Sequence, residues 1–193
     1  MTNGTKAAVQ QKCDVENSLL LIIDIQTKLG QAMPTKVLNR VISNTSLLSR
    51  AAELLDVPVL VTEQYPQGLG PTITDISDAL PATAVTLDKT AFSSAAAQGF
   101  DDVLERANRK QIIIVGMESH ICVLQSALDL LSTGYDVYVV EDAVCSRRLE
   151  NYQNALDRLR QAGVGIISAE SAIFEWLVHS RHEHFKAISA LLR

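Results

Sequence analysis

The chain has 193 residues, of which 47% are hydrophobic and 20% are charged, and its formal net charge is −5. A chain of this length and composition can bury one hydrophobic core, and its acidic balance gives no basic surface for binding nucleic acid. No apolar run approaches the roughly 18–20 residues that span a bilayer, so we expect no contact with a membrane.

The N-terminal residues 1–17 are polar and contain neither the apolar core of a signal peptide nor the arginine-rich pattern of a transit peptide. We predict a flexible tail over 1–17 and a single domain over 18–193. The three cysteines cannot all pair, and none has metal-ligand spacing. This pattern is typical of a reducing compartment, so we predict a cytoplasmic location.

The first predicted strand, residues 18–26, has five consecutive apolar residues from Leu19 and is too hydrophobic for a solvated face. A helix is predicted from Pro34, because apolar residues then recur at steps of three and four. Residues 57–65 form the second predicted strand. Glycine and proline mark the following residues, 66–75, as a loop.

A short third strand is predicted over 84–89, followed by a helix over 95–109. Residues 110–117 are rich in isoleucine and valine, which is typical of a buried fourth strand. The next stretch, 121–134, is apolar on nearly every turn and ends at a glycine, as a helix with a glycine C-cap does.

The last third of the chain continues the alternation. Residues 135–144 predict a fifth strand, and a helix from Leu149 ends at Gly163. Residues 164–170 predict a sixth strand, and 171–193 complete the chain as one or two helices.

Strands that alternate with helices imply right-handed βαβ units and a parallel sheet covered on both faces. We therefore predict a three-layer αβα fold with a six-stranded, mainly parallel, Rossmann-like sheet in the order 3-2-1-4-5-6. Ligands bind such sheets beyond the carboxyl ends of the strands, where the strand order reverses. The predicted crevice lies between the first and fourth strands.

Cys122 follows the fourth strand at the start of a predicted helix. Ser119 is the expected N-cap, which places Cys122 in the first turn. A thiol there lies near unpaired N–H groups and the positive end of the helix dipole, and both favour the thiolate. From this stretch alone, Cys122 is either a reactive thiol or a small apolar residue in a buried helix.

Asp24 ends the first strand and Lys89 ends the third, so both are predicted at the same sheet edge as Cys122. Taken alone, an aspartate at a strand end can form a turn, and a lysine there is usually solvated. The presence of both beside a cysteine at one sheet edge favours a catalytic site. Asp24 would accept the thiol proton as general base, and Lys89 would orient the carboxylate. The thiolate would attack a carbonyl carbon, and water would release the acid from the thioester.

Four short motifs, in this order, resemble the isochorismatase-like cysteine hydrolase superfamily, which includes nicotinamidases and N-carbamoylsarcosine amidohydrolases. The resemblance runs from about Leu19 to Ile173. The motifs are D-x-Q at residues 24–26, K-x-x-F-S at 89–93, a strand-end glycine with a helix-start cysteine (Gly116 and Cys122), and the D-A-V-C-S-R segment at 142–147.

The resemblance implies that Asp24, Lys89 and Cys122 form a catalytic triad. It also implies a cis peptide between Met117 and Glu118 that aims the Glu118 N–H, with that of Cys122, into an oxyanion hole. These assignments make the protein a metal-independent hydrolase of a small amide or related acyl compound.

The resemblance also shows departures. Metal-dependent nicotinamidases carry a D-x-H signature after the second strand, whereas residues 62–70 here contain no histidine. We therefore predict no metal and no cofactor, which weighs against nicotinamidase activity. His182 and His184, in the run HSRHEH, would face different sides of a helix, so we interpret that run as a solvated helix end. His120 either lines the pocket or makes hydrogen bonds at the helix start.

The segment over 62–70 most resembles isochorismatase domain-containing proteins, whose substrates are largely unassigned. Candidate substrate-pocket residues are Gln26, Gln64, Tyr65 and Phe92. The alternatives are a surface turn for Gln64 and Tyr65 and a core position for Phe92. Cys145 is interpreted as structural, because no acid or base motif accompanies it.

Two alternatives to a hydrolase remain open from the sequence. The first is a catalytically silent binding or scaffold protein that keeps the fold. The second is thiol-based redox sensing, which we rank last because no resolving cysteine lies near Cys122. The apolar C-terminal helices either cap the sheet or form an interface, and we predict a homo-oligomer that binds a small-molecule substrate.

Overall fold

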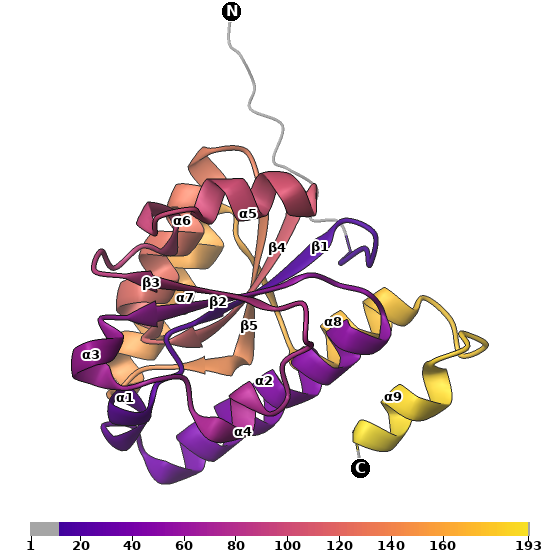
Figure 1. The fold of residues 1–193 in the computed structure, drawn as a ribbon, viewed down its shortest axis with the longest axis horizontal. Helices are drawn as coiled ribbons and strands as arrows, with labels where there is room; N and C mark the ends of the chain where they lie inside the picture. Colours follow the sequence, from indigo (N-terminus) through magenta and orange to yellow (C-terminus); the bar gives the residue numbers. More distant parts are fainter. Residues whose placement is uncertain (1–11, 193) are drawn as a thin grey trace, which may run out of the picture.

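The computed structural model describes residues 12–192, which contain one six-stranded parallel sheet. The sheet has the order β3-β2-β1-β4-β5-β6, and every neighbouring pair is parallel, as predicted (Figure 1). The order reverses between β1 and β4, which is where ligands bind in folds of this class. The strands are β1 (Ser18–Ile23), β2 (Val59–Gln64), β3 (Val85–Lys89), β4 (Gln111–Met117), β5 (Asp136–Cys145) and β6 (Gly165–Ile167).

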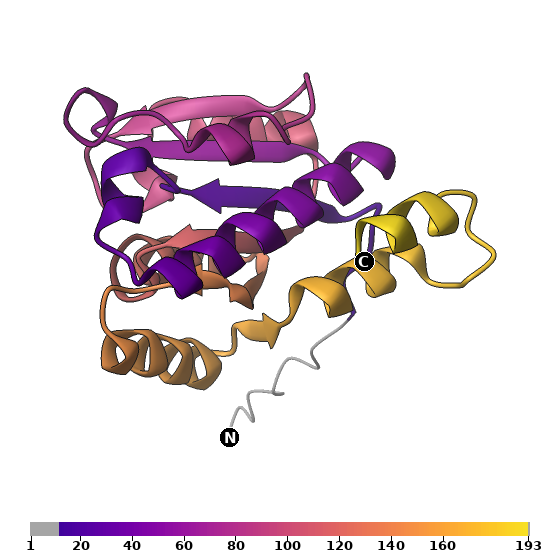
Figure 2. The ribbon, with the colours of Figure 1, turned by 90° about the horizontal axis from the view of Figure 1, so that it is seen from below.

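Helices cover both faces of the sheet. Figure 2 shows α2 running along one face with α8 and α9 beside it, and α5, α6 and α7 lie on the other. The helices are α1 (Thr27–Gln31), α2 (Thr35–Leu54), α3 (Pro66–Leu69), α4 (Thr74–Ser77), α5 (Phe100–Ala107), α6 (Leu124–Ser132), α7 (Leu149–Ala162), α8 (Ala169–Leu177) and α9 (Phe185–Leu191), with a 3₁₀ turn η1 (Ser94–Ala96) and a π turn η2 (Ser119–Val123).

The first strand shows why the central strands are apolar throughout. Leu20 and Ile22 belong to the core under α2 and α8, whereas Leu19, Leu21 and Ile23 belong to the core under α5 and α6. Successive side chains of a strand point to opposite faces, so a sheet with helices on both sides needs hydrophobic residues at every position.

Some predicted elements differ from the observed ones. The helix predicted over 95–109 is shorter, because Gly99 (φ 81°) lies before its first residue and Asn108 (φ 51°) ends it in the left-handed region. The predicted loop over 66–75 contains the one-turn helices α3 and α4, and α1 was not predicted. Four- and five-residue helices bury too little apolar surface to show a helical period in sequence.

The first described residues pack against the domain. Cys13 is buried, and its N–H donates to the Glu175 carboxylate at 2.7 Å. The N–H of Asp14 donates to the side-chain oxygen of Gln111 at 2.7 Å. Cys13 and Asp14 thus contact the domain, the predicted boundary at residue 18 stays a prediction, and the remainder of the predicted tail lies outside the described residues.

The C-terminal helices cap the sheet. Trp176 is fully buried, and its indole N–H donates to the Ser18 hydroxyl at 2.9 Å. Phe174, Val178 and Leu191 are 40%, 79% and 37% exposed, so this segment keeps some apolar surface that an interface could use. The homo-oligomer stays a prediction.

The HSRHEH run is a turn between α8 and α9, so the prediction that it ends a helix is wrong. The three imidazole rings of this run lie next to one another. The ring centroids of His179 and His182 are 6.3 Å apart, and those of His182 and His184 are 5.7 Å apart. Over residues 12–192, no group of three or more histidine, cysteine, aspartate or glutamate side chains is arranged to hold a metal ion.

Gly116 allows β1 and β4 to approach closely near their carboxyl ends. Its φ is 131°, and a Cβ there would overlap the carbonyl oxygen of Ile23. We expect Gly116→Ala to lower the free energy of unfolding by about 3 kcal/mol or more, because backbone strain and steric overlap add. Urea denaturation measures this. Gly134→Ala is the matched control, since Gly134 also has a positive φ but nothing lies within 4 Å of a Cβ there. Equal losses in the two variants would contradict the steric argument.

Candidate active site

Three side chains from separate segments meet at the carboxyl edge of the sheet. Asp24 follows β1, Lys89 ends β3, and Cys122 lies in η2, directly after β4. The Lys89 Nζ donates to Asp24 Oδ2 at 2.7 Å, and both side chains are fully buried. The Cys122 thiol lies close enough to Asp24 and to Lys89 for both to shift its pKa. The structure therefore brings together the three groups that the sequence predicted to converge.

The Lys89 ammonium is held by oxygen atoms on several sides. Besides Asp24, it donates to the side-chain oxygen of Gln64 at 2.7 Å and to the carbonyl oxygens of Phe92 at 3.0 Å and Ala91 at 3.3 Å. These polar partners compensate for the removal of a cation from water. The ammonium is thereby fixed beside the carboxylate.

Asp24 turns the chain sharply after β1. It adopts the left-handed conformation (φ 53°), which aspartate tolerates better than most residues, and its N–H donates to the carbonyl of Thr62 at 2.9 Å. Burial raises the pKa of Asp24 above its usual value. Lys89, Cys122 and Thr62 oppose this rise without cancelling it. The carboxylate is thus a stronger base than a solvated aspartate.

Cys122 differs from the sequence expectation in its resting protonation state. The thiol is 6% exposed, and burial, with the nearby Asp24 charge, raises its pKa to about 12, although Lys89 opposes this. Burial and the Asp24 charge thus act against the thiolate that the helix start favours. The proton stays on sulfur until a neighbour removes it, and Asp24 is the base in contact with it.

The turn that carries Cys122 is a π turn. Hydrogen bonds from Val123 N and Leu124 N reach back five residues, to the carbonyls of Glu118 and Ser119. Ser119 is the first residue of this turn and its hydroxyl is buried without a partner, so the prediction that it is an N-cap is wrong. The Met117–Glu118 peptide is cis, as the resemblance implies.

The side chains of Glu118 and His120 hold this turn against the connection between β5 and α7. The Glu118 carboxylate accepts hydrogen bonds from the backbone N–H of Arg147 at 3.0 Å and from its Nε at 3.1 Å. His120 contacts the Ser146 hydroxyl at 3.0 Å and the Asn151 amide at 3.3 Å. This favours the hydrogen-bonding alternative for His120. The oxyanion-hole role of the Glu118 and Cys122 N–H groups stays a prediction.

Two of the predicted pocket residues form an internal scaffold. Gln26 is fully buried; its oxygen accepts from the Gln64 N–H at 2.7 Å, and its NH₂ donates to the carbonyls of Gln64 and Gly70. The Gln64 amide donates to Thr90 O and accepts from Lys89. Both amides are thus engaged within the protein, which gives Gln26 a supporting position and not the predicted place in the pocket wall.

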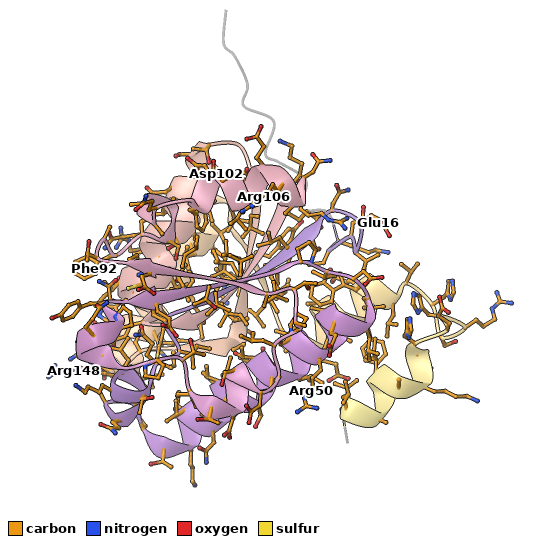
Figure 3. All side chains as sticks on the ribbon, in the orientation of Figure 1. Glu16, Arg50, Phe92, Asp102, Arg106 and Arg148 are labelled. Carbon is orange, nitrogen blue, oxygen red and sulfur yellow. The ribbon has the colours of Figure 1, made fainter. Side chains whose placement is uncertain are left out.

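Tyr65 and Phe92 lie at the surface beside this scaffold, with 54% and 53% of their area exposed. Figure 3 shows Phe92 and Arg148 on the same side of the molecule, toward which the strands run. The alternative core position for Phe92 is therefore wrong. A hollow of about 340 Å³ borders Tyr65 and Lys89 but not Cys122. Two larger hollows, of about 700 and 580 Å³, lie at the opposite end of the strands and contain no predicted site residue.

Cys145 ends β5 opposite Met117 and is fully buried. Burial raises the pKa of its thiol to about 12, which suits the structural interpretation. It borders a small hollow of about 110 Å³ on the α2 side of the sheet.

Sequence reasoning missed three hydroxyl residues next to the site. Thr62 Oγ1 donates to Asp24 Oδ1 at 3.1 Å and lies 3.2 Å from Ser94 Oγ. Ser126 Oγ accepts from Ser94 N and donates to Cys122 O, both at 2.7 Å. In the sequence, each is only a small polar residue in or near an apolar strand or helix. Many buried residues share that pattern, so it does not identify a site.

The isochorismatase domain model matches residues 18–171. The chain belongs to the isochorismatase family. A secreted isochorismatase effector, Isc1, of Phytophthora sojae is 41% identical over 92% of this chain and 85% of its own length. Isochorismatase domain-containing protein 2 of Danio rerio is 35% identical over 94% of this chain and 89% of its own length.

Solved structures share the fold of this isochorismatase-family protein. A MAR1 ribonuclease from Caenorhabditis elegans matches with a TM-score of 0.89 and 35% identity, covering 94% of this chain and 92% of that one. The YcaC protein of Escherichia coli, described as an octameric hydrolase of unknown specificity, matches with a TM-score of 0.85 and 23% identity, covering 95% and 90%.

The location of this isochorismatase-family protein stays a prediction. Within residues 12–192, no helix is long and apolar enough to cross a membrane. One relative, in Phytophthora, is described as secreted, so family membership does not decide between compartments.

Proposed function

We propose that this protein is a cysteine hydrolase that cleaves the C–N bond of a small amide, or a related acyl compound, through a thioester on Cys122. The observation that carries the proposal is the contact of the Cys122 thiol with the buried Asp24–Lys89 pair. A thiol with a pKa of about 12 is inert unless a base lies in contact with it, and Asp24 is such a base.

The reaction follows from these positions. Asp24 accepts the thiol proton as sulfur attacks the carbonyl carbon, and the N–H groups of Glu118 and Cys122 hold the oxyanion. The C–N bond then breaks, and the proton on Asp24 passes to the leaving amine. Water next gives a proton to Asp24 and adds to the thioester carbon. The acid leaves, and the proton returns to sulfur. Lys89 keeps its charge throughout.

A cysteine nucleophile favours amides over isochorismate. Isochorismate is a vinyl ether, and its hydrolysis needs no nucleophilic thiol. The exposed rings of Tyr65 and Phe92 suit contact with a small organic substrate at the carboxyl edge of the sheet. We propose Tyr65 and Phe92 as its contacts.

Two other functions each have one observation in their favour. The Caenorhabditis elegans relative is described as a ribonuclease, so RNA cleavage needs a direct test. The net charge of −5 disfavours a polyanionic substrate. A scaffold protein without turnover is the second competitor, since the substrates of the resembling branch are largely unassigned.

One experiment separates the three functions. Iodoacetamide labelling of the intact protein is followed by peptide mass spectrometry at Cys13, Cys122 and Cys145. Ammonia release from a panel of small primary amides and degradation of a single-stranded RNA are measured in parallel. We expect Cys122 to react about 10²-fold faster than the other two thiols near neutral pH, because Asp24 accepts its proton. Asp24→Asn should remove this difference, and at least one amide should release ammonia.

The other outcomes are equally clear. Equal, slow labelling of all three thiols with no ammonia release would support the scaffold function. RNA degradation that persists after Cys122 is alkylated would contradict the cysteine mechanism.

A further inference from the structure

Behind the Asp24–Lys89 pair lies a row of buried hydroxyl groups that the proposed reaction does not use. Thr62 lies in β2, Ser94 in η1 and Ser126 in α6, and all three are fully buried. Thr62 Oγ1 lies 3.1 Å from Asp24 Oδ1 and 3.2 Å from Ser94 Oγ. The row thus begins at the carboxylate oxygen that Lys89 does not occupy.

The direction of these hydrogen bonds is fixed while Asp24 is ionised. A carboxylate can only accept, so the single proton of the Thr62 hydroxyl points to Asp24 Oδ1. The Thr62 oxygen must then accept from Ser94 Oγ, since each hydroxyl has one proton and two lone pairs. Two hydroxyls therefore donate in series toward the carboxylate.

The same row can reverse once Asp24 is protonated. A proton on Oδ1 would donate to Thr62 Oγ1, and the Thr62 hydroxyl would then donate to Ser94 Oγ. Neither oxygen of Asp24 loses its partner, because Lys89 stays on Oδ2. In the reversed row the Ser94 proton no longer has Thr62 as its acceptor, so the cost of an unpaired polar atom falls on Ser94 and not on the base that must gain and lose a proton.

Ser94 also links the base to the nucleophile. Its backbone N–H donates to Ser126 Oγ at 2.7 Å, and Ser126 Oγ donates to the Cys122 carbonyl at 2.7 Å. One residue of η1 is thus connected to the carboxylate on one side and to the cysteine turn on the other.

We propose that Thr62 and Ser94 are positioning residues whose reversible hydroxyl pair keeps Asp24 hydrogen-bonded both before and after it accepts the Cys122 proton. This inference rests on the proposed function, because it assigns Asp24 as the base. Transfer is balanced within the site: the S–H bond of Cys122 breaks, an O–H bond forms on Asp24, and the electron pair stays on sulfur for attack.

The test is the pH dependence of Cys122 alkylation by iodoacetamide in Thr62→Val, Thr62→Ser and Ser94→Ala. Alkylation needs Asp24 ionised, so its rate falls on the acidic side as the carboxylate becomes protonated. The charged and titratable groups that face Asp24 are Lys89 from β3 and the Cys122 thiol from η2, and they are unchanged in each variant.

Thr62→Val removes one donor to the carboxylate, so it raises the pKa of Asp24. We expect the acidic midpoint to move up by about 0.7 pH unit, the size of one ordinary hydrogen bond. Ser94→Ala should move it in the same direction by about half as much, and Thr62→Ser should restore it to within about 0.2 unit. Thr45→Val is the matched control, since the buried Thr45 hydroxyl has no partner, and it should leave the midpoint in place.

A structural role alone would change stability without moving the midpoint, so urea denaturation of each variant is measured in parallel. An unmoved midpoint in folded Thr62→Val would overturn the inference while Cys122 alkylation still supports the proposed function. If Thr62→Val does not fold, an unmoved midpoint in Ser94→Ala has the same meaning. Wild-type Cys122 that resists alkylation at every pH would overturn the proposed function and, with it, this inference.

Discussion

Cys122→Ala is expected to lower kcat for a responsive amide by about 10⁴-fold or more, because removing the nucleophile leaves only binding and the oxyanion donors. Cys122→Ser should be nearly as poor. A serine hydroxyl is a much weaker acid than a thiol, and a carboxylate with Lys89 beside it cannot remove its proton readily. Steady-state ammonia release, corrected for folded protein, measures both losses.

Cys13→Ala is the matched control for this prediction. Cys13 is also a buried free thiol, but it lies against Glu175, far along the chain from the site. We expect it to lose some stability and to keep its turnover per folded molecule. Turnover within tenfold of wild type in Cys122→Ala would show that the thioester mechanism is wrong.

Lys89→Met is expected to cost about 3–5 kcal/mol of the free energy of unfolding near neutral pH, because it leaves the buried Asp24 carboxylate without its cation. It should also lower turnover by about 10²–10⁴-fold, because Lys89 no longer orients the carboxylate and a larger share of Asp24 holds a proton and cannot act as a base. Urea denaturation and ammonia release measure the two effects.

The stability loss in Lys89→Met should depend on pH in a defined direction. Burial already raises the pKa of Asp24 above its ordinary 3.8, and Lys89 opposes that rise. Without the ammonium the folded pKa rises further, so the folded state binds more protons than the unfolded state above about pH 3.8. Stability therefore falls as pH rises through the folded pKa, and the loss should be smaller near pH 4 than near pH 7.

Asp24→Asn combined with Lys89→Met tests the same pair without a buried charge. The double variant should regain most of the stability lost by Lys89→Met and should show no turnover. A double variant that is less stable than Lys89→Met would mean that the carboxylate does not carry the cost.

The alternation of elements was enough to predict the architecture. Strands such as 110–117 are apolar on both faces, and only a parallel sheet between two helical layers needs that pattern. The convergence of Asp24, Lys89 and Cys122 followed from the same topology, since the carboxyl ends of parallel strands share one edge. The short helices α1, α3 and α4 were not predicted, because their form depends on contacts with distant residues.

The D-x-Q motif did not reveal the hydrogen bonds that Gln26 makes. Its place in D-x-Q next to Asp24 suggested a pocket residue, but its amide is used to fix Gln64, which in turn holds Lys89. The row Thr62, Ser94 and Ser126 was not predicted for the same reason. Hydrogen bonds between residues twenty-five or more positions apart leave no period or spacing in sequence.

The sequence by itself determined the strand order, the edge where chemistry is expected and the identity of the three converging groups, because periodicity and strand-end position depend on local composition. Only the tertiary structure showed how burial and neighbouring charges act on the Cys122 thiol. Sequence placed Cys122 where a helix start favours the thiolate, but its burial beside Asp24 raises the pKa to about 12. Desolvation and the charges of neighbouring strands act through space, so the local position of Cys122 at a helix start does not reveal them.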